Sequence, residues 1–272
     1  SYGHRWGDFG WDSSFTFSAN KNEIVELVKD YVHPETGKTY NVDKLELKTD
    51  EGRGFGKAKF ILKEGGTLGD LYTHADLKRD INGNVLIDDS GNVTAIDNAG
   101  DIKLGSVLPK ANLAWNNSFS YKGINAGFLL TARLGGIVYS ATQAYLDLYG
   151  VSETSAAARD AGGVWINGRS RVNPQSFYEV VASQSGLPTY YTYSATNLRL
   201  QEAHIGYTVP RRWLGNVCDI NVSLVGRNLW MIYCKAPFDP EAVATTNNYY
   251  QGIDYFMMPS TRNIGFNIKI NF

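Results

Sequence analysis

The 272-residue chain has few of the side chains that most often build catalytic or covalent sites. Its only two cysteines, Cys218 and Cys234, lie at opposite ends of one predicted strand. Such a strand spans roughly 50 Å, whereas a disulfide needs Cα atoms within about 7 Å, so we expect two free thiols. The four histidines are scattered without metal-ligand spacing, and no Gly-x-Ser-x-Gly or Cys/His arrangement occurs. We therefore expect no enzyme activity and no catalytic residues.

Charge and long apolar runs are also scarce. Charged residues make up 19% of the chain and the net charge is −1, which gives no electrostatic basis for binding nucleic acid. No run of 18 apolar residues occurs, and this excludes a transmembrane helix. Membrane-spanning strands are still compatible with the sequence, because such strands are short and apolar on one face only.

Aromatic residues (13%) and glycines (28) are abundant, as is typical of all-β proteins. In the last eleven residues, Ile264, Phe266, Ile268 and Ile270 alternate with asparagine, glycine and lysine, which predicts a strand with one apolar and one polar face. Five other segments share this pattern, and one of them changes phase, which predicts a β-bulge near residues 201–203. The expected antiparallel strands lie near residues 9–19, 108–121, 124–134, 196–209, 219–230 and 262–272.

The connections between these strands alternate between long loops and short turns. Long loops are expected at residues 20–107, 135–195 and 232–259, with short helices near 23–32 and 154–159. Long loops on one side only are typical of an outer-membrane β-barrel, with short periplasmic turns and long extracellular loops. A soluble β-sandwich would give the same alternation within each strand. In a barrel the polar face would line a wet lumen, and in a sandwich it would face solvent. The candidate lumen-facing residues are Asn112, Asn125, Arg133, Asn221, Arg227, Asn267 and Lys269.

Six segments of the chain form a specific series. They are 152–160 (SETSAAARD), 197–210 (NLRLQEAHIGYTVP), 225–230 (VGRNLW), 237–241 (PFDPE), 252–254 (GID) and 259–272 (PSTRNIGFNIKINF). In their order and spacing, these segments resemble the C-terminal part of the SusC/RagA family of TonB-dependent outer-membrane transporters. The resemblance covers most of the chain and is strongest from residue 108 onward.

The resemblance implies a 22-stranded barrel that is closed by an N-terminal plug and energised through TonB. It also implies a SusD-like surface lipoprotein as partner, extracellular loops and a periplasmic C-terminus. Phe272 would be the terminal aromatic residue that the barrel-assembly machinery reads. The sequence shows no plug domain, and six strands cannot close so wide a barrel. We therefore expect further barrel and plug polypeptide to complete this wall within the outer-membrane lipid.

The predicted loops carry further candidate residues. Exposed aromatic rings stack on sugars or pack against partner proteins, and they can also pack within their own loop. Asp239 and Glu241 flank a proline, and we expect them to order their loop by hydrogen bonds; a glycosidase carboxylate pair is the alternative. The candidates for substrate or partner contact are Trp165, Tyr190, Tyr191, Tyr193, Tyr249 and Tyr250.

Residues Asp80, Asn82 and Asn84 space their oxygens like the start of a calcium loop. The glycine at position 83 is misplaced for such a loop, and no glutamate stands at its twelfth position. An Asn-Gly hairpin turn explains the same residues. We expect no cofactor here, with calcium as the alternative.

The sequence thus predicts the barrel wall and extracellular loops of a transporter that takes up oligosaccharides or peptides across the bacterial outer membrane. The alternative is a soluble or surface-exposed β domain that binds glycan without transporting it. Membrane fractionation separates the two, because a soluble domain needs no detergent.

Overall fold

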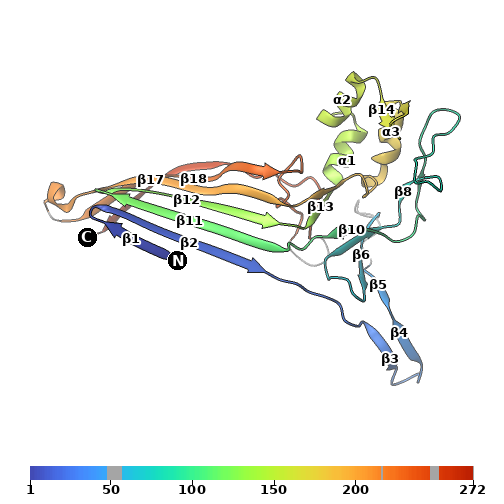
Figure 1. The fold of residues 1–272 in the computed structure, drawn as a ribbon, viewed down its shortest axis with the longest axis horizontal. Helices are drawn as coiled ribbons and strands as arrows, with labels where there is room; N and C mark the ends of the chain where they lie inside the picture. Colours follow the sequence, from blue (N-terminus) through green and yellow to red (C-terminus); the bar gives the residue numbers. More distant parts are fainter. Residues whose placement is uncertain (48–56, 216, 246–250, 272) are drawn as a thin grey trace.

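The computed structural model describes residues 1–47, 57–215, 217–245 and 251–271. The chain forms two parts (Figure 1). One is a long antiparallel sheet. The other is an assembly of short strands and helices at one end of that sheet, and we call it the loop region.

The long sheet is an antiparallel meander of seven strands, each paired with the next one along the sheet. The sequence predicted six; the missed strand is β1, which pairs with β2 from Tyr2 opposite Ser13 to Trp6 opposite Phe9. The sequence does contain the pattern of this strand, because the aromatic rings of Tyr2, His4 and Trp6 stand at every second position. In spatial order the strands are β1 (Tyr2–Trp6), β2 (Phe9–Ala19), β11 (Ala111–Tyr121), β12 (Ile124–Leu134), β17 (Asn197–Val209), β18 (Asp219–Cys234) and β20 (Asn263–Asn271).

Strand bounds follow the alternation where it is strict. Strands β2 and β12 coincide with the predicted ranges 9–19 and 124–134. The register of β17 against both neighbours shifts between Leu200 and Glu202, so Gln201 is the extra residue of the predicted bulge. Strand β18 continues four residues past the predicted end at 230. Cys234 is its last residue and Cys218 precedes it, and both are free thiols.

All three short turns lie at one end of the sheet and all three long connections at the other (Figure 1). The turn between β11 and β12 is only Lys122-Gly123, and both residues have positive φ (47° and 89°). This backbone is that of a type I′ hairpin turn, which suits the right-handed twist of the paired strands. The turn between β17 and β18 contains one 3-10 turn, η2 (Arg211–Leu214).

The first long connection folds into short β-hairpins. The helix expected near 23–32 is wrong: Ile24 exchanges two backbone hydrogen bonds of 2.9 Å with Gly65 and Gly66, and β3 follows in extended conformation. The β-branched residues Val25, Val28 and Val32 favour this extended backbone. The strands are β3 (Val28–Val32), β4 (Thr39–Val42), β5 (Lys44–Glu46), β6 (Ala58–Lys63), β7 (Asp70–Thr73), β8 (Asp76–Leu77), β9 (Ala95–Ile96) and β10 (Ile102–Ser106).

The second long connection carries the helices. Ser140, Ser152 and Asn173 cap the three α-helices, each accepting a hydrogen bond from the first helical turn. Helix α2 contains the predicted helical segment 154–159. The elements are β13 (Ile137–Ser140), α1 (Ala141–Leu148), α2 (Glu153–Asp160), β14 (Val164–Ile166), β15 (Ser170–Val172), α3 (Pro174–Val181), η1 (Ser183–Ser185) and β16 (Thr192–Ser194).

The third long connection joins the second one through β19 (Ile253–Asp254), which pairs in parallel with β13. Ser140 donates a 2.6 Å hydrogen bond to Asp254 within this contact. The first connection adds to the same body, because Val85 forms two hydrogen bonds with the side chain of Asn167. The three loops predicted from the sequence are therefore one folded region.

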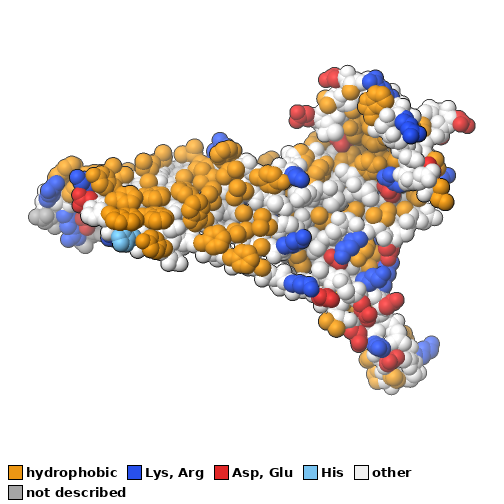
Figure 2. Space-filling view, viewed as in Figure 1, with side chains coloured by type: hydrophobic (Ala, Val, Ile, Leu, Met, Phe, Trp, Pro, Cys, Tyr) orange, Lys and Arg blue, Asp and Glu red, His pale blue; other side chains and the backbone are white. Residues whose placement is uncertain are grey.

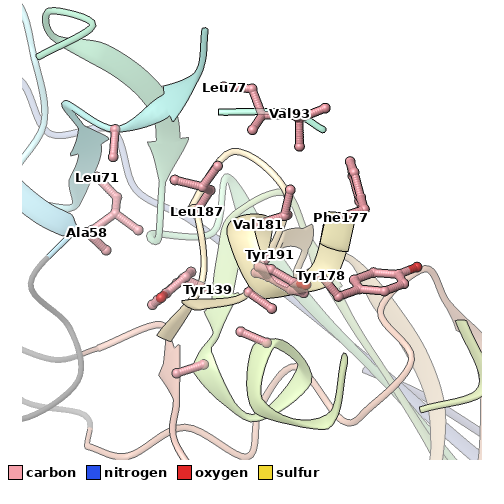
Figure 3. Close-up of a cluster of buried hydrophobic side chains, with 14 of the residues drawn as sticks. Ala58, Leu71, Leu77, Val93, Tyr139, Phe177, Tyr178, Val181, Leu187 and Tyr191 are labelled. Atoms are coloured by element: carbon pink, nitrogen blue, oxygen red, sulfur yellow. The ribbon is translucent and has the colours of Figure 1, made fainter. Parts of the chain in front are cut away.

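The hydrophobic core of the protein lies in this loop region (Figure 3). Leu71 from β7, Tyr139 from β13 and Val181 from α3 each expose 1% or less of their surface. The Tyr139 hydroxyl donates a 2.6 Å hydrogen bond to the carbonyl of Ser185, which satisfies its one buried polar atom. In the part of the chain that the structure describes, no helix is long and apolar enough to cross a membrane.

Candidate functional site

The cross-strand register places all seven predicted lumen-facing residues on one face of the sheet. Residues that oppose each other in an antiparallel pair point to the same side. Asn112 opposes Arg133, and the row from Asn125 runs through Gly206 and Ser223 to Asn267. We call this side the polar face. It carries Asn112, Asn125, Arg133, Asn221, Arg227, Asn267 and Lys269.

The opposite side of the sheet, the apolar face, carries large hydrophobic side chains, many of which are exposed in the part of the chain that the structure describes. Phe17, Leu224 and Phe266 expose 62%, 54% and 78% of their surface. Figure 2 shows hydrophobic side chains spread along the sheet, with most of the charged groups toward its two ends. A water-soluble protein rarely exposes so large an apolar area, whereas lipid would solvate it.

Asn117 and Ser13 are polar residues on the apolar face, and each accepts a hydrogen bond from a tryptophan. Asn117 is 2% exposed, and its side-chain oxygen accepts a 3.1 Å hydrogen bond from Trp11 Nε1. Ser13, directly opposite Asn117, accepts a 3.0 Å hydrogen bond from Trp115 Nε1. Each hydrogen bond gives a partner both to the polar side chain and to the indole N–H. Either group would cost free energy if it were left unpaired in an apolar medium. Asn117 interrupts the alternation of apolar side chains along β11, and the hydrogen bond from Trp11 gives its side-chain oxygen a partner.

The polar face holds charged and amide groups in cross-strand pairs. The Arg227 guanidinium donates a 3.0 Å hydrogen bond to Glu202, and Asn221 donates one of 2.8 Å to Thr208. Such a surface is compatible with water and with hydrogen-bonding ligands, and it runs from the short turns to the loop region.

At the loop end of the polar face lies an ionic cluster centred on Arg199. Its guanidinium donates two hydrogen bonds to Asp239, of 2.7 and 3.1 Å, and lies 3.2 Å from Glu241. The Arg199 side chain is 5% exposed and that of Asp239 is 9% exposed. Asn197 donates a further 3.2 Å hydrogen bond to Glu241. The two predicted loop-ordering carboxylates therefore bind one strand arginine, whose role the local sequence did not indicate.

The Asp239 carboxyl is held as a carboxylate. Burial alone would raise its pKa, but hydrogen bonds from Arg199, from the Glu241 backbone and from Ser260, with the charge of Arg199, hold the pKa below its usual range. The carboxylate also orders its own loop, since its Oδ1 accepts the Glu241 N–H at 3.0 Å. This geometry fixes the third long connection to the end of β17.

The predicted contact aromatics differ in their surroundings. Trp165 is 55% exposed and stacks on Arg171, whose Cζ lies 4.5 Å from the ring centre, so it is available to a partner. Tyr190 is half-buried and packs edge-to-face on Phe177. Tyr193 is half-buried and packs edge-to-face on Phe238, across two long connections.

Tyr191 corrects the sequence interpretation. It is 2% exposed and its hydroxyl donates a 2.9 Å hydrogen bond to Asp147. Burial, together with the negative charge of Asp147, raises the pKa of Tyr191. This ring packs inside the core and is not presented to a ligand. The sequence could not show this, because neighbouring tyrosines in a folded loop can point either to the core or to the surface. Tyr249, Tyr250 and Phe272 lie outside the described residues.

The segment with the calcium-like spacing forms a tight turn. Asp80 Oδ1 accepts the backbone N–H groups of Asn82 and Asn84 at 2.8 Å, and Asp80 Oδ2 accepts the Asn84 amide at 3.0 Å. These hydrogen bonds lower the pKa of Asp80. Asp88 repeats the same turn eight residues later, with Ser90 and Asn92 as donors. Over the described ranges, no group of three or more His, Cys, Asp or Glu side chains is placed to hold a metal ion.

Comparison with known proteins agrees with this geometry. No protein-family model matches the chain. The chain is 25% identical to TonB-dependent receptor P3 and 25% identical to TonB-dependent receptor P26, both of Formosa agariphila, over 96% and 98% of its length. It spans 27% and 28% of those two receptors, so it matches little more than a quarter of each.

The fold is similar to that of solved transporters. It superposes on a structure of the RagAB peptide transporter with a TM-score of 0.64, at 18% identity, covering 99% of this chain and 28% of that one. The RagAB peptide importer in its "closed-closed" state gives the same TM-score at 17% identity. In sequence the chain is thus similar to TonB-dependent receptors over nearly its whole length, and it shares its fold with part of the RagAB transporter; both similarities support the resemblance to the SusC/RagA family of TonB-dependent outer-membrane transporters.

Proposed function

We propose that this chain forms part of the wall and the extracellular loop region of an importer of oligosaccharides or peptides, driven through TonB. The observation that carries the proposal is the division of the sheet into two faces. One face is apolar and uncovered, and the other is polar, continuous, and opens at the folded loop region. A ligand captured among the loops would meet hydrogen-bonding groups along its path and no lipid.

The sheet requires further strands on both sides. Strands β1 and β20 are its two edges, and each pairs with one neighbour in the described part of the chain. Unpaired backbone groups are not viable in lipid, so both edges need partner strands. We propose that the remaining barrel and plug polypeptide supplies these strands, closes the lumen and contacts TonB.

A SusD-like surface lipoprotein is the proposed second partner. The loop region presents Trp165 with its stacked Arg171, and Tyr149 is 74% exposed at the C-terminal end of α1. Exposed aromatic and arginine side chains are typical anchors of protein interfaces. On this proposal the loops are extracellular, and the short turns and the C-terminus are periplasmic.

Neighbouring residues of β20 give a direct test of the two faces. In the full transporter, with Cys218 and Cys234 replaced by serine, we expect Asn267→Cys to react rapidly with a membrane-impermeant maleimide. Phe266→Cys should react at least tenfold more slowly, because its side chain would face lipid. Labelling is measured in purified outer membranes by the mass shift of the modified chain.

The matched pair Ser223→Cys and Leu224→Cys on β18 serves as a control, since Ser223 opposes Asn267 and Leu224 opposes Phe266. Equal water exposure at both members of each pair would contradict the barrel wall. It would favour the alternative, a surface β domain that binds glycan without transport.

The partners are tested by affinity purification from detergent-solubilised outer membranes, with a tag placed in the 135–195 connection. Identification by mass spectrometry of a lipoprotein and of the remaining barrel sequence supports the proposed assembly. Recovery of this chain in the soluble fraction without detergent contradicts it.

A further inference from the structure

A cavity of about 670 Å³ lies where the polar face meets the loop region. Its floor is the loop end of β2 and β11, including Ser18 and Asn112, which oppose each other on the polar face. Its walls come from the segments around residues 20–22, 106–110 and 135–137. The cavity thus lies at the loop end of the surface that we assign to the lumen, where an incoming ligand would first meet it.

The ionisable groups on the cavity wall are both cationic. Lys21 and Lys110 line it, and among the described residues no carboxylate does. Lys21 lies 3.3 Å from Glu23, but both side chains are largely exposed, so this ion pair is weak. Lys110 is exposed and forms no ion pair within the part that the structure describes. The nearby buried carboxylate of Asp70 is already bound to Lys103 at 2.5 Å.

A third cation lies behind the same wall. Arg133 donates a 2.8 Å hydrogen bond from Nη2 to the carbonyl of Val107, and its buried Nε has no acceptor among the residues that the structure describes. Gly136, a wall residue, separates it from the cavity: a Cβ on Gly136 would lie 3.3 Å from Arg133 Nη2. A side chain at position 136 would therefore crowd the guanidinium.

Neutral donors complete the wall. The side-chain amides of Asn20 and Asn112 have no partner among the described residues and are exposed to the cavity region. The hydroxyls of Thr67 and Ser106 also line the cavity, but Thr67 donates to Asp70 at 2.8 Å and Ser106 donates to Thr67 at 2.9 Å, so neither hydroxyl proton is left for a ligand. Ammonium and amide donors around a space without acidic groups favour an anion with planar oxygens.

We propose that this cavity is a subsite for a carboxylate group of the imported ligand, with Lys110 as its principal contact. The inference rests on the proposed import function and adds the ligand's charge to it. Both proposed classes of ligand can carry a carboxylate: a peptide at its C-terminus, and an oligosaccharide in a uronic acid.

The test uses the full transporter, purified in detergent, and two matched pairs of probes. One pair is acetylated tetra-alanine with a free carboxylate or with a C-terminal amide. The other is tetragalacturonate or its methyl ester. We expect one pair to show about tenfold tighter binding of the carboxylate form, the effect of one charge-assisted contact, and that pair identifies the source.

Variants then locate the contact. Lys110→Gln should remove the preference for the carboxylate form, and Lys110→Arg should keep it. Lys78→Gln, at an exposed lysine outside the cavity, should also keep it and is the matched control. Because Lys110 is exposed, its replacement leaves the packed core intact.

The other possible results of these binding experiments would overturn the proposed subsite. Equal binding of both forms, no binding of any probe, or loss of preference in Lys78→Gln as in Lys110→Gln would overturn the subsite. Uptake of the same probes by cells is measured separately. A Lys110-dependent preference without any uptake would support the subsite and overturn the import function, whereas uptake without preference would do the reverse.

Discussion

Replacing Arg199 by alanine is expected to release the third long connection from the sheet. The change leaves the buried Asp239 carboxylate without its bidentate partner, and breaking a buried ion pair on one side costs about 3–5 kcal/mol. In the full transporter, amide hydrogen exchange at Glu241 to Ala244 should accelerate by two to three orders of magnitude. These amides are protected now by Asp239, Glu241 and Ile253.

Arg227→Ala is the matched control for this experiment. Arg227 lies on the same polar face and also pairs with a glutamate, but its side chain is 68% exposed, so its loss should cost less than about 1 kcal/mol. A double variant, Arg199→Ala with Asp239→Ala, should be less destabilised than the sum of the single changes, because it removes the uncompensated charge. Unchanged exchange at Glu241 to Ala244 in Arg199→Ala would show that the cluster does not order the loop.

The same cluster gives a pH dependence with a defined sign. The pKa of Asp239 is lower in the folded protein than in the unfolded chain, so the stabilisation is complete above the unfolded value of about 3.9. It declines as the pH falls from there through the folded pKa. In Arg199→Ala the hydrogen bonds and the charge of Arg199 no longer oppose burial, and only those from the Glu241 backbone and Ser260 still do, so the pKa of Asp239 should rise and acid should destabilise the loop less. Between pH 7 and pH 3, loop protection should therefore fall less in Arg199→Ala than in the unchanged protein; an equal fall in both would contradict the role of Arg199.

The sequence predicted six of the seven strands of the sheet, because one apolar and one polar face impose a strict period of two. The bounds of β12 follow from alternation alone, and so does the common face of Asn125 and Asn267. The prediction was incomplete where that period breaks. In β18 the period breaks at Asn228, whose φ is 51°. The residues that follow, 229–233, are all apolar, and two register shifts between β17 and β18 place them on both faces of the strand.

The fold of the loop region and its contacts could not be predicted from local sequence patterns. Its core is assembled from short pieces of three connections, such as β7, α1 and β19, each too short to show a period. The Arg199 cluster joins residues 40 positions apart, and nothing near Arg199 in the sequence marks Asp239 as its partner. The cavity beside Lys110 likewise depends on segments from two connections. The resemblance to a transporter family gave the architecture, but only the coordinates bring these side chains together.

An arginine placed on the apolar face should be the most damaging change to the wall itself. Leu224 lies near the middle of the apolar stretch between Ile220 and Trp230, opposite Ile205 and Phe266, and exposes 54% of its surface. Leu224→Arg would put a charge near the bilayer midplane, at a cost of about 2–4 kcal/mol.

Ser223→Arg is the control one residue away. Ser223 points to the polar face, opposite Gly206 and Asn267, where a charged side chain remains in water and should cost less than about 1 kcal/mol. Both variants are compared in lipid vesicles by the urea concentration at which the full transporter loses its heat-modifiable gel mobility. A one-residue shift thus separates a lipid-facing from a water-facing position with the chemical change held nearly constant. Equal loss of stability in the two variants would mean that the two faces of this sheet meet the same medium, and the wall would then have to be placed outside the membrane.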